Sequence, residues 1–203
     1  MSATRRDILL SLKWDNPSRL VKTYAEERFA EMLVNEGKFR LWPLEYFREI
    51  EDPSRKDQRE GQLITGGPKG VRHSRFQGNP KFLFCVSGAD VDPASQRRFG
   101  KYVVQIGDPT RFAQDLHAWL NQSQCGEMIG SIECLKVLYG VHDDLVFNQH
   151  GDSLIYSNKP AEYAQEKEYR IVLIGKADAR QTSYLDVDLG WPLPYLKRVE
   201  QRA

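Results

Sequence analysis

The chain has 203 residues, of which 28% are charged, and its formal net charge is only +1. This length suits one domain with a substantial core, and the charge balance excludes a protein that is basic or acidic throughout. Its three cysteines are widely spaced without a CxxC pair, and no apolar stretch approaches the roughly 20 residues of a membrane span, so we expect one cytoplasmic domain, residues 1–203.

Two helices are predicted from the spacing of apolar residues. The first, at 26–35, carries its apolar side chains on one face and is followed by Gly37, a residue typical of a helix C-terminus. The second, at 108–121, begins with Asp108 as an N-cap and with Pro109 at the first helical position.

Several segments are typical of strands because they are rich in β-branched and aromatic residues or alternate between apolar and polar residues. These segments are 38–42, 81–87, 101–106, 134–139, 169–174 and 184–189. Strands and helices do not alternate as βαβ units, which disfavours a Rossmann sheet. We therefore expect an α+β fold, in which a few helices flank a mixed, mostly antiparallel sheet.

The segment 55–81 is predicted to be a mobile basic loop, because it contains five glycines and seven lysines or arginines against two acids. Its candidate nucleic-acid-binding residues are Lys69, Arg72, Arg75 and Lys81. These cations would neutralise phosphates, and a nearby aromatic residue would stack on bases. One open interpretation is therefore a nucleic-acid-binding module without catalysis.

Metal and nucleophile motifs give weaker indications. The acidic residues Glu51, Asp52, Asp57 and Glu60 would suit a metal-dependent nuclease, although a solvated charged face explains them better. Neither an HExxH helix nor a Cys/His ligand spacing occurs, so no metal ligand is assigned. Cys85 lies within an apolar strand pattern, which favours an inert buried thiol over a catalytic nucleophile.

A pair of carboxylates precedes the apolar run at 171–174. If the strand begins early, Glu166 and Glu168 point to the same side, because side chains two residues apart in a strand share a face. Two carboxylates would then lie together at a strand edge. The alternative is that they only solubilise the end of the strand.

The order of these features resembles the ADP-ribosyltransferase superfamily. The resemblance consists of a first strand at 21–24, a helix ending at 35–37, a second strand at 39–41 and a glutamate, Glu168, on a late strand. The late Glu-x-Glu-Tyr-Arg segment at 166–170 is also similar to a segment in a broad bacterial group. The resemblance implies an ADP-ribosyltransferase-like fold and nicotinamide adenine dinucleotide (NAD) as the substrate.

The same resemblance implies roles for individual residues. Glu168 would stabilise the oxocarbenium-like state that forms when the nicotinamide–ribose bond breaks, and Glu166 would orient the acceptor nucleophile. Arg40 would meet the pyrophosphate as a planar fork, and Tyr46 would stack on nicotinamide. The implied NAD-binding residues are Lys22, Tyr24, Arg40, Tyr46 and Ser87.

The leading interpretation is a transferase that moves ADP-ribose to a nucleic acid or a protein, as a toxin or phage-defence effector. A toxin would imply an antidote protein, which the sequence does not identify, and the oligomeric state is not predicted. On this interpretation, Glu168 is expected to matter more to activity than to stability.

Overall fold

The computed structural model describes residues 7–49, 62–67, 70–75, 79–140, 142–143, 153, 156–177, 179 and 182–200. Its main feature is a nine-stranded sheet. The strands of this sheet are β1 (Leu9–Lys13), β2 (Leu20–Tyr24), β3 (Lys38–Pro43), β6 (Lys81–Gly88), β7 (Tyr102–Ile106), β8 (Ile129–Lys136), β12 (Glu168–Gly175), β13 (Leu185–Asp188) and β14 (Leu196–Val199).

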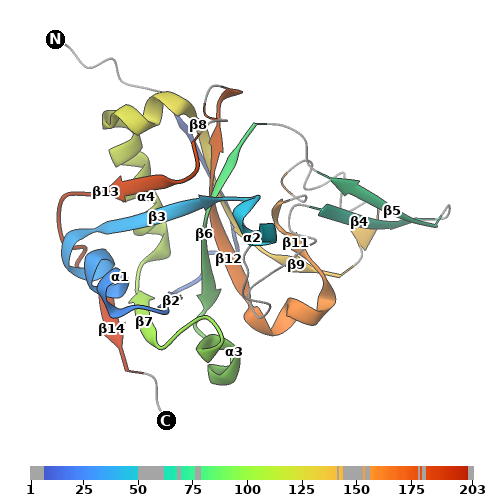
Figure 1. Cartoon of the computed structure of the whole chain (residues 1–203), viewed down its shortest axis with the longest axis horizontal. Helices are drawn as coiled ribbons and strands as arrows, with labels where there is room; N and C mark the ends of the chain where they lie inside the picture. Colours follow the sequence, from blue (N-terminus) through green and yellow to red (C-terminus); the bar gives the residue numbers. More distant parts are fainter. Residues whose placement is uncertain are drawn as a thin grey trace.

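The order along the sheet is β1–β8–β12–β6–β2–β7–β14, and β3 with its neighbour β13 joins at β6 (Figure 1). Among the described pairings of this sheet, β1 with β8 is the parallel one, and the others are antiparallel. The predicted single-domain α+β fold with a mostly antiparallel sheet is therefore confirmed.

The helices are short apart from one. They are α1 (Glu27–Glu31), the π-helical turn η1 (Met32–Glu36), α2 (Tyr46–Glu49), α3 (Pro93–Arg97), α4 (Pro109–Gln122), and the 3-10 helices η2 (Gln124–Met128) and η4 (Ala161–Glu166). The longest, α4, has 14 residues, and no helix in the described part of the chain has the length and apolarity needed to cross a bilayer.

The sheet forks along one edge of β6. There β6 pairs with β2 only through Gly88 and Ser87, and with β3 only through Leu83 and Phe82. Between these contacts, no described strand covers the edge of β6, and the Nζ atom of Lys22 donates to the Cys85 carbonyl at 2.8 Å. Lys22 thus satisfies a backbone carbonyl that strand pairing leaves without a donor. The sheet therefore has two branches, one that continues from β6 through β2 and one that continues through β3, and a cleft separates them.

The main core lies on one face of the sheet, against α4. Phe84 of β6, Phe39 of β3 and Phe112 of α4 form a cluster of rings with centroids 4.8 to 5.6 Å apart. The Asp108 carboxylate caps α4 by accepting from the Arg111 amide at 2.8 Å, as the sequence predicts. Aromatic packing therefore ties the β3 branch to the centre of the molecule.

A smaller core covers the opposite face of the sheet. It contains Leu44, Leu83, Leu135, Tyr156 and Val172, with Phe47 and Cys85 packed against it. Alternate residues of β6 serve the two cores, because successive side chains of a strand point to opposite faces. Glu168 and Arg170 of β12 lie on this second face of the sheet, because they occupy alternate positions of the strand together with Val172 of the smaller core.

Most predicted segments coincide with observed elements. The segment 134–139 is the exception: β8 ends at Lys136, and Leu138–Tyr139 form a separate short strand, β9, which pairs with β11 (Asn158–Lys159). Gly37 ends the first helix in the left-handed region (φ 66°), where a Cβ atom would also lie 2.6 Å from the Trp191 carbonyl oxygen.

Part of the segment predicted to be a mobile basic loop forms strands where the structure describes it. β4 (Gln62–Gly67) and β5 (Gly70–Arg75) form an antiparallel hairpin, and β10 (His142–Asp143) extends it into a small separate sheet (Figure 1). The glycines of the segment, which suggested a loop, include the Gly67 and Gly70 pair at the end of this hairpin.

Lys81 is also misassigned. It is the first residue of β6 and is only 5% exposed, so it does not lie on a basic surface loop. Its ammonium group donates to the Asn79 carbonyl at 2.9 Å and lies 5.6 Å from the Tyr156 ring centroid. The long apolar stem of lysine allows this burial, because the charged end still finds acceptors.

Candidate active site

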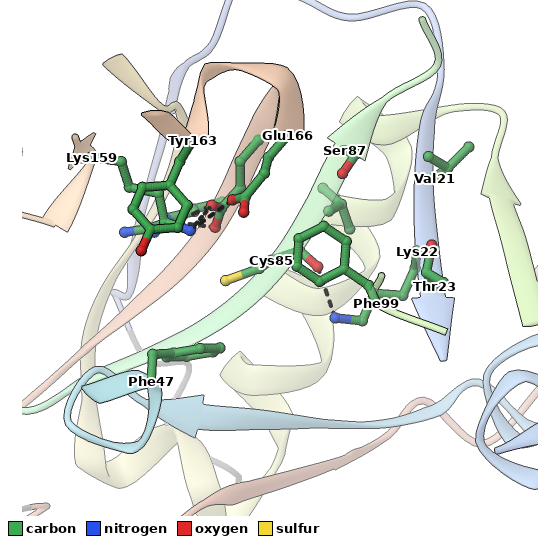
Figure 2. A pocket seen from close by; sticks show the side chains of 13 residues that line it. Val21, Lys22, Thr23, Phe47, Cys85, Ser87, Phe99, Lys159, Tyr163 and Glu166 are labelled. Atoms are coloured by element: carbon green, nitrogen blue, oxygen red, sulfur yellow. Dashed lines mark hydrogen bonds and ion pairs between the residues drawn. The ribbon is translucent and has the colours of Figure 1, made fainter. Parts of the chain in front are cut away.

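A cleft lies at the fork of the sheet and consists of two adjoining parts. The larger part, about 630 Å³, extends between the branches that carry β2 and β3. The smaller part, about 100 Å³, is lined by residues that include members of β2, β6, β11, η4 and β12, and is called the polar end below (Figure 2). The larger volume is typical of a site for a small organic molecule.

The cleft brings together every residue predicted for catalysis or NAD binding. The polar end is lined by Glu166, Glu168 and Ser87, the larger part by Tyr24, Arg40 and Tyr46, and both by Lys22. Figure 2 shows Lys159 and Glu166 on one side of β6, with Lys22 and Phe99 on the other. Residues that are far apart in the sequence therefore share one concave surface.

Four buried charged side chains meet at the polar end and are called the ion cluster: Lys159, Glu166, Glu168 and Arg170. The Nζ atom of Lys159 lies 2.9 Å from Glu166 Oε2 and 2.8 Å from Glu168 Oε2. Arg170 Nε donates to Glu168 Oε1 at 2.7 Å, and Arg170 Nη1 donates to the Tyr156 carbonyl at 2.7 Å. Two cations thus balance two carboxylates, which is the condition for burying charges at tolerable cost.

The two glutamates converge by a different route from the predicted one. The strand does not begin early: Glu166 ends η4, and β12 begins at Glu168. Between them, Lys167 adopts the left-handed conformation, with φ 45° and ψ 47°. This residue reverses the chain, so that a helical and a strand carboxylate reach the same lysine.

The conformation of Lys167 is itself informative. A non-glycine residue in the left-handed region costs on the order of 1–3 kcal/mol, and such residues cluster at functional sites. Here Lys167 is held by its Nζ atom, which lies 2.6 Å from Asp90 Oδ2, and by its carbonyl, which accepts from the Gly88 amide at 2.8 Å. The surroundings therefore support a backbone geometry that brings the two glutamates together.

The two carboxylates have pKa values shifted in opposite directions. Burial favours the neutral form of Glu168, but the charges of Arg170 and Lys159 outweigh burial and lower the pKa of Glu168 far below its usual value. Burial and the neighbouring Glu168 charge raise the pKa of Glu166, although Lys159 opposes this shift. Such a pair provides one stable anion and one carboxyl group that binds a proton more readily than an ordinary glutamate does.

The larger part of the cleft carries stacked aromatic and cationic groups. Tyr46 stacks on Trp42 with ring centroids 4.1 Å apart, so one face of the Tyr46 ring is covered. The Arg40 guanidinium lies 3.7 Å from the Tyr184 ring centroid and forms a bidentate pair with Asp186, at 2.7 and 3.0 Å. Both predicted ligand-binding side chains therefore already have protein partners.

Two further groups at the cleft have defined environments. The Tyr24 hydroxyl is buried and has no hydrogen-bond partner among the residues that the structure describes. A buried hydroxyl left in this state costs about 1–3 kcal/mol, so a ligand group that reached it would relieve that cost. Burial raises the pKa of the Cys85 thiol, which agrees with the interpretation of an inert cysteine.

Sequence reasoning missed Lys159 and Arg170. Arg170 carries a detectable signal, since an arginine two residues after Glu168, inside a strand with an apolar run, shares its face and needs a buried partner. Lys159 gives no comparable signal, because its approach depends on the pairing of β11 with β9.

The remaining candidate residues belong to the nuclease and nucleic-acid-binding interpretations. The proposed nuclease residues Glu51, Asp52, Asp57 and Glu60 lie outside the described residues, as does Lys69. Arg72 and Arg75 belong to β5. Within the described ranges, no group of three or more His, Cys, Asp or Glu side chains is arranged to hold a metal ion.

Comparison with known proteins gives no match: no family model, no curated protein and no solved structure is similar to the chain.

Proposed function

We propose that the chain is an ADP-ribosyltransferase-like enzyme that cleaves the nicotinamide–ribose bond of NAD and transfers ADP-ribose to a nucleic acid or a protein. The observation that carries the proposal is the position of Glu168, a buried anionic carboxylate at the polar end of a cleft whose adjoining larger part has a volume of about 630 Å³. The cleft is also lined by the residues that the sequence resemblance assigns to NAD.

The residue chemistry suits this reaction. When the bond breaks, its electron pair leaves with nicotinamide, and positive charge develops on the ribose. A fixed anion stabilises that charge without reorganising, which is an effective form of electrostatic catalysis. Arg170 and Lys159 hold Glu168 in the required ionised form, because they lower its pKa.

Glu166 is assigned to the acceptor. An acceptor hydroxyl, amine or base nitrogen that attacks the ribose carbon must lose a proton as the new bond forms. A carboxylate with a raised pKa accepts a proton better than an ordinary glutamate does. The shifted pKa of Glu166 therefore supports a role in orienting the acceptor and taking up its proton.

The rest of the dinucleotide would lie along the larger part of the cleft. The Arg40–Asp186 pair is largely exposed, and such pairs contribute only about 0–1 kcal/mol, so a pyrophosphate can replace the carboxylate on the guanidinium fork. Nicotinamide would stack on the face of Tyr46 that Trp42 leaves open.

The proposal is tested by incubating the protein with NAD labelled in the adenylate moiety, together with RNA, DNA or a protein mixture. The proposal predicts that label becomes covalently attached to one class of acceptor. Binding of nucleic acid without any consumption of NAD would instead favour the non-catalytic alternative. That alternative draws its support from the β4–β5 hairpin, which carries Arg72 and Arg75.

A toxin or phage-defence role is proposed on the same basis, because consumption of NAD or modification of nucleic acid would harm the host cell. Expression of the wild-type protein in a bacterial host should then reduce growth. An equal effect of the Glu168→Gln variant would contradict a toxic role that depends on catalysis.

A further inference from the structure

Lys159 is a buried lysine that contacts both glutamates of the ion cluster. Its side chain is 11% exposed, and its ammonium group lies within 2.9 Å of each carboxylate. Glu168 already has a second cation, because Arg170 donates to its other carboxylate oxygen. Lys159 is therefore the group that joins Glu166 to the pair formed by Glu168 and Arg170.

Short strands determine where Lys159 lies. β11 pairs with β9 so that Lys159 is opposite Tyr139, and the Gly140 amide donates to the Lys159 carbonyl at 2.8 Å. The Tyr139 hydroxyl in turn accepts from the Glu168 amide at 2.8 Å. The β9–β11 pair thus fixes both the lysine and the first residue of β12 relative to each other.

The chain then returns to the same lysine. Pro160 precedes η4, and the last residue of η4 is Glu166, whose carboxylate points back at Lys159 (Figure 2). The segment from Lys159 to Glu168 therefore forms a closed loop around one ammonium group.

We propose that Lys159 is a positioning residue of the candidate active site, whose ammonium group holds both carboxylates at the polar end of the cleft and keeps Glu168 there in its anionic form. The reaction that it serves rests on the proposed function, whereas its action on the carboxylates does not. Lys159 acts through the two glutamates and is assigned no contact with NAD.

Other titratable and charged groups face the two glutamates, and their contributions must be separated from that of Lys159. They are Arg170 on β12, Tyr139 on β9, Cys85 on β6, Lys22 on β2 and Tyr163 on η4. Only Lys159 forms an ion pair with both carboxylates among the described residues. Replacing Lys159 should therefore shift the pH at which both glutamates titrate.

The first test measures the carboxylates directly and needs no substrate. The side-chain carboxyl carbons of the glutamates are labelled with carbon-13, and the Glu168 signal is assigned by its loss in Glu168→Gln and followed as the pH is lowered. In the wild type, Glu168 should stay ionised below the pH at which exposed glutamates protonate. In Lys159→Met, its titration should move up by about one pH unit or more.

Two further variants show whether a change in the Glu168 titration is specific to the loss of the Lys159 charge. Lys136→Met removes another lysine paired with a carboxylate, Asp15 at 2.7 Å, and should leave the Glu168 titration unchanged. Lys159→Gln is measured in parallel, so the result can be taken from whichever variant keeps the wild-type circular dichroism spectrum. An unchanged Glu168 titration in a folded Lys159 variant overturns the proposal.

The second test uses the rate of nicotinamide release from NAD. Lys159→Met should lower kcat by about tenfold or more and shift the acid limb of the pH–rate profile to higher pH, while changing KM less. Lys159→Arg should recover most of the rate, because it retains the charge. A lysine with only a structural role would leave the acid limb where it is.

The two tests separate the two claims. If the wild-type protein releases no nicotinamide, the proposed function fails, and the carboxylate titration still decides whether Lys159 controls the glutamates. If nicotinamide is released but neither the titration nor the acid limb responds to Lys159→Met, the proposed function stands and the positioning role is refuted.

Discussion

Glu168 pairs with the buried Arg170, and the same carboxylate is proposed to stabilise the transition state of NAD cleavage. The sequence alone predicts that Glu168 matters more to activity than to stability. In the fold, however, Glu168 neutralises Arg170, which is only 1% exposed. Removing one member of a buried pair leaves an uncompensated charge, so a substitution at Glu168 must be judged for stability as well as for rate.

Glu168→Gln is therefore expected to lower the free energy of unfolding by about 3–5 kcal/mol near pH 7. The pKa of Glu168 is lowered in the folded state, so its stabilisation is fully present above the usual carboxyl pKa. This stabilisation is lost as the pH falls through the lowered pKa. The difference between wild type and variant should thus shrink at about pH 3.

Urea unfolding at several pH values measures this difference. The double variant Glu168→Gln, Arg170→Met should be less destabilised than the sum of the two single variants, because it removes both buried charges. A stability loss that is the same at all pH values would show that the charge of Glu168 is not its cause.

Arg40 presents the opposite case, an exposed ion pair that competes with a ligand. Asp186→Asn removes the carboxylate that occupies the Arg40 fork and one of three negative charges at the larger part of the cleft. We expect NAD to bind about 2- to 5-fold more tightly to this variant, as suits the loss of a competing pair of about 0–1 kcal/mol. Isothermal titration calorimetry measures the Kd, and weaker binding would place the pyrophosphate elsewhere.

Among the elements, the long periodic segments were predictable and the edges of the sheet were not. The helix α4 and the central strands β6 and β12 are largely buried, and this burial requires apolar residues at positions that can be recognised in the sequence. β1 was missed because it is a short edge strand with an exposed residue, Leu9, so its apolar residues do not alternate by face. The β4–β5 hairpin was mistaken for a loop because its glycines and charges suggest solvent exposure.

The same distinction applies to the candidate site. The resemblance named NAD-binding candidates, and the structure places them along one cleft. The resemblance gave no geometry for the ion cluster, because the convergence of Glu166 and Glu168 depends on the left-handed residue Lys167 and on Lys159, which β11 positions. The local sequence around each residue does not predict the tertiary contacts between Lys159 and the two glutamates.

The junction between η4 and β12 gives a prediction at this scale. Lys167→Val places a β-branched residue in the left-handed conformation and should destabilise the fold by about 1–3 kcal/mol, while separating Glu166 from Glu168. Lys167→Asn also removes the pair with Asp90, but asparagine tolerates this conformation. Urea unfolding should therefore find the valine variant clearly less stable, and equal stabilities would argue against backbone strain at this junction.

At the scale of the whole molecule, the central feature is a sheet that forks and leaves a cleft. β6 carries two branches, and the cleft between them receives side chains from β2, β3, α2 and β13. A separate small sheet holds the β4–β5 hairpin with Arg72 and Arg75 (Figure 1). In the proposed function, the cleft would bind the small substrate and the hairpin would contact the macromolecular acceptor.

Replacing Arg72 and Arg75 together with alanine tests the role of the hairpin. If the hairpin contacts a nucleic-acid acceptor, affinity should fall similarly for all sequences and the salt dependence should flatten, because phosphate contacts carry little base information. Release of nicotinamide in the absence of an acceptor should be unchanged. Fluorescence anisotropy over a range of salt concentrations measures the effect, and an unchanged affinity and salt slope would exclude the hairpin from the binding site.

The central claim, that Glu168 stabilises the transition state of NAD cleavage, is tested most directly by the rate of nicotinamide release in three proteins. The control is Glu133→Gln, which replaces a glutamate of β8 that bonds to Tyr156 and Ser153 and pairs with Lys13. The account predicts release by the wild type and by the control, and a loss of roughly 100- to 1,000-fold in Glu168→Gln, about 2.7–4 kcal/mol. Full turnover by folded Glu168→Gln, or a wild-type protein that neither binds nor cleaves NAD, would contradict it.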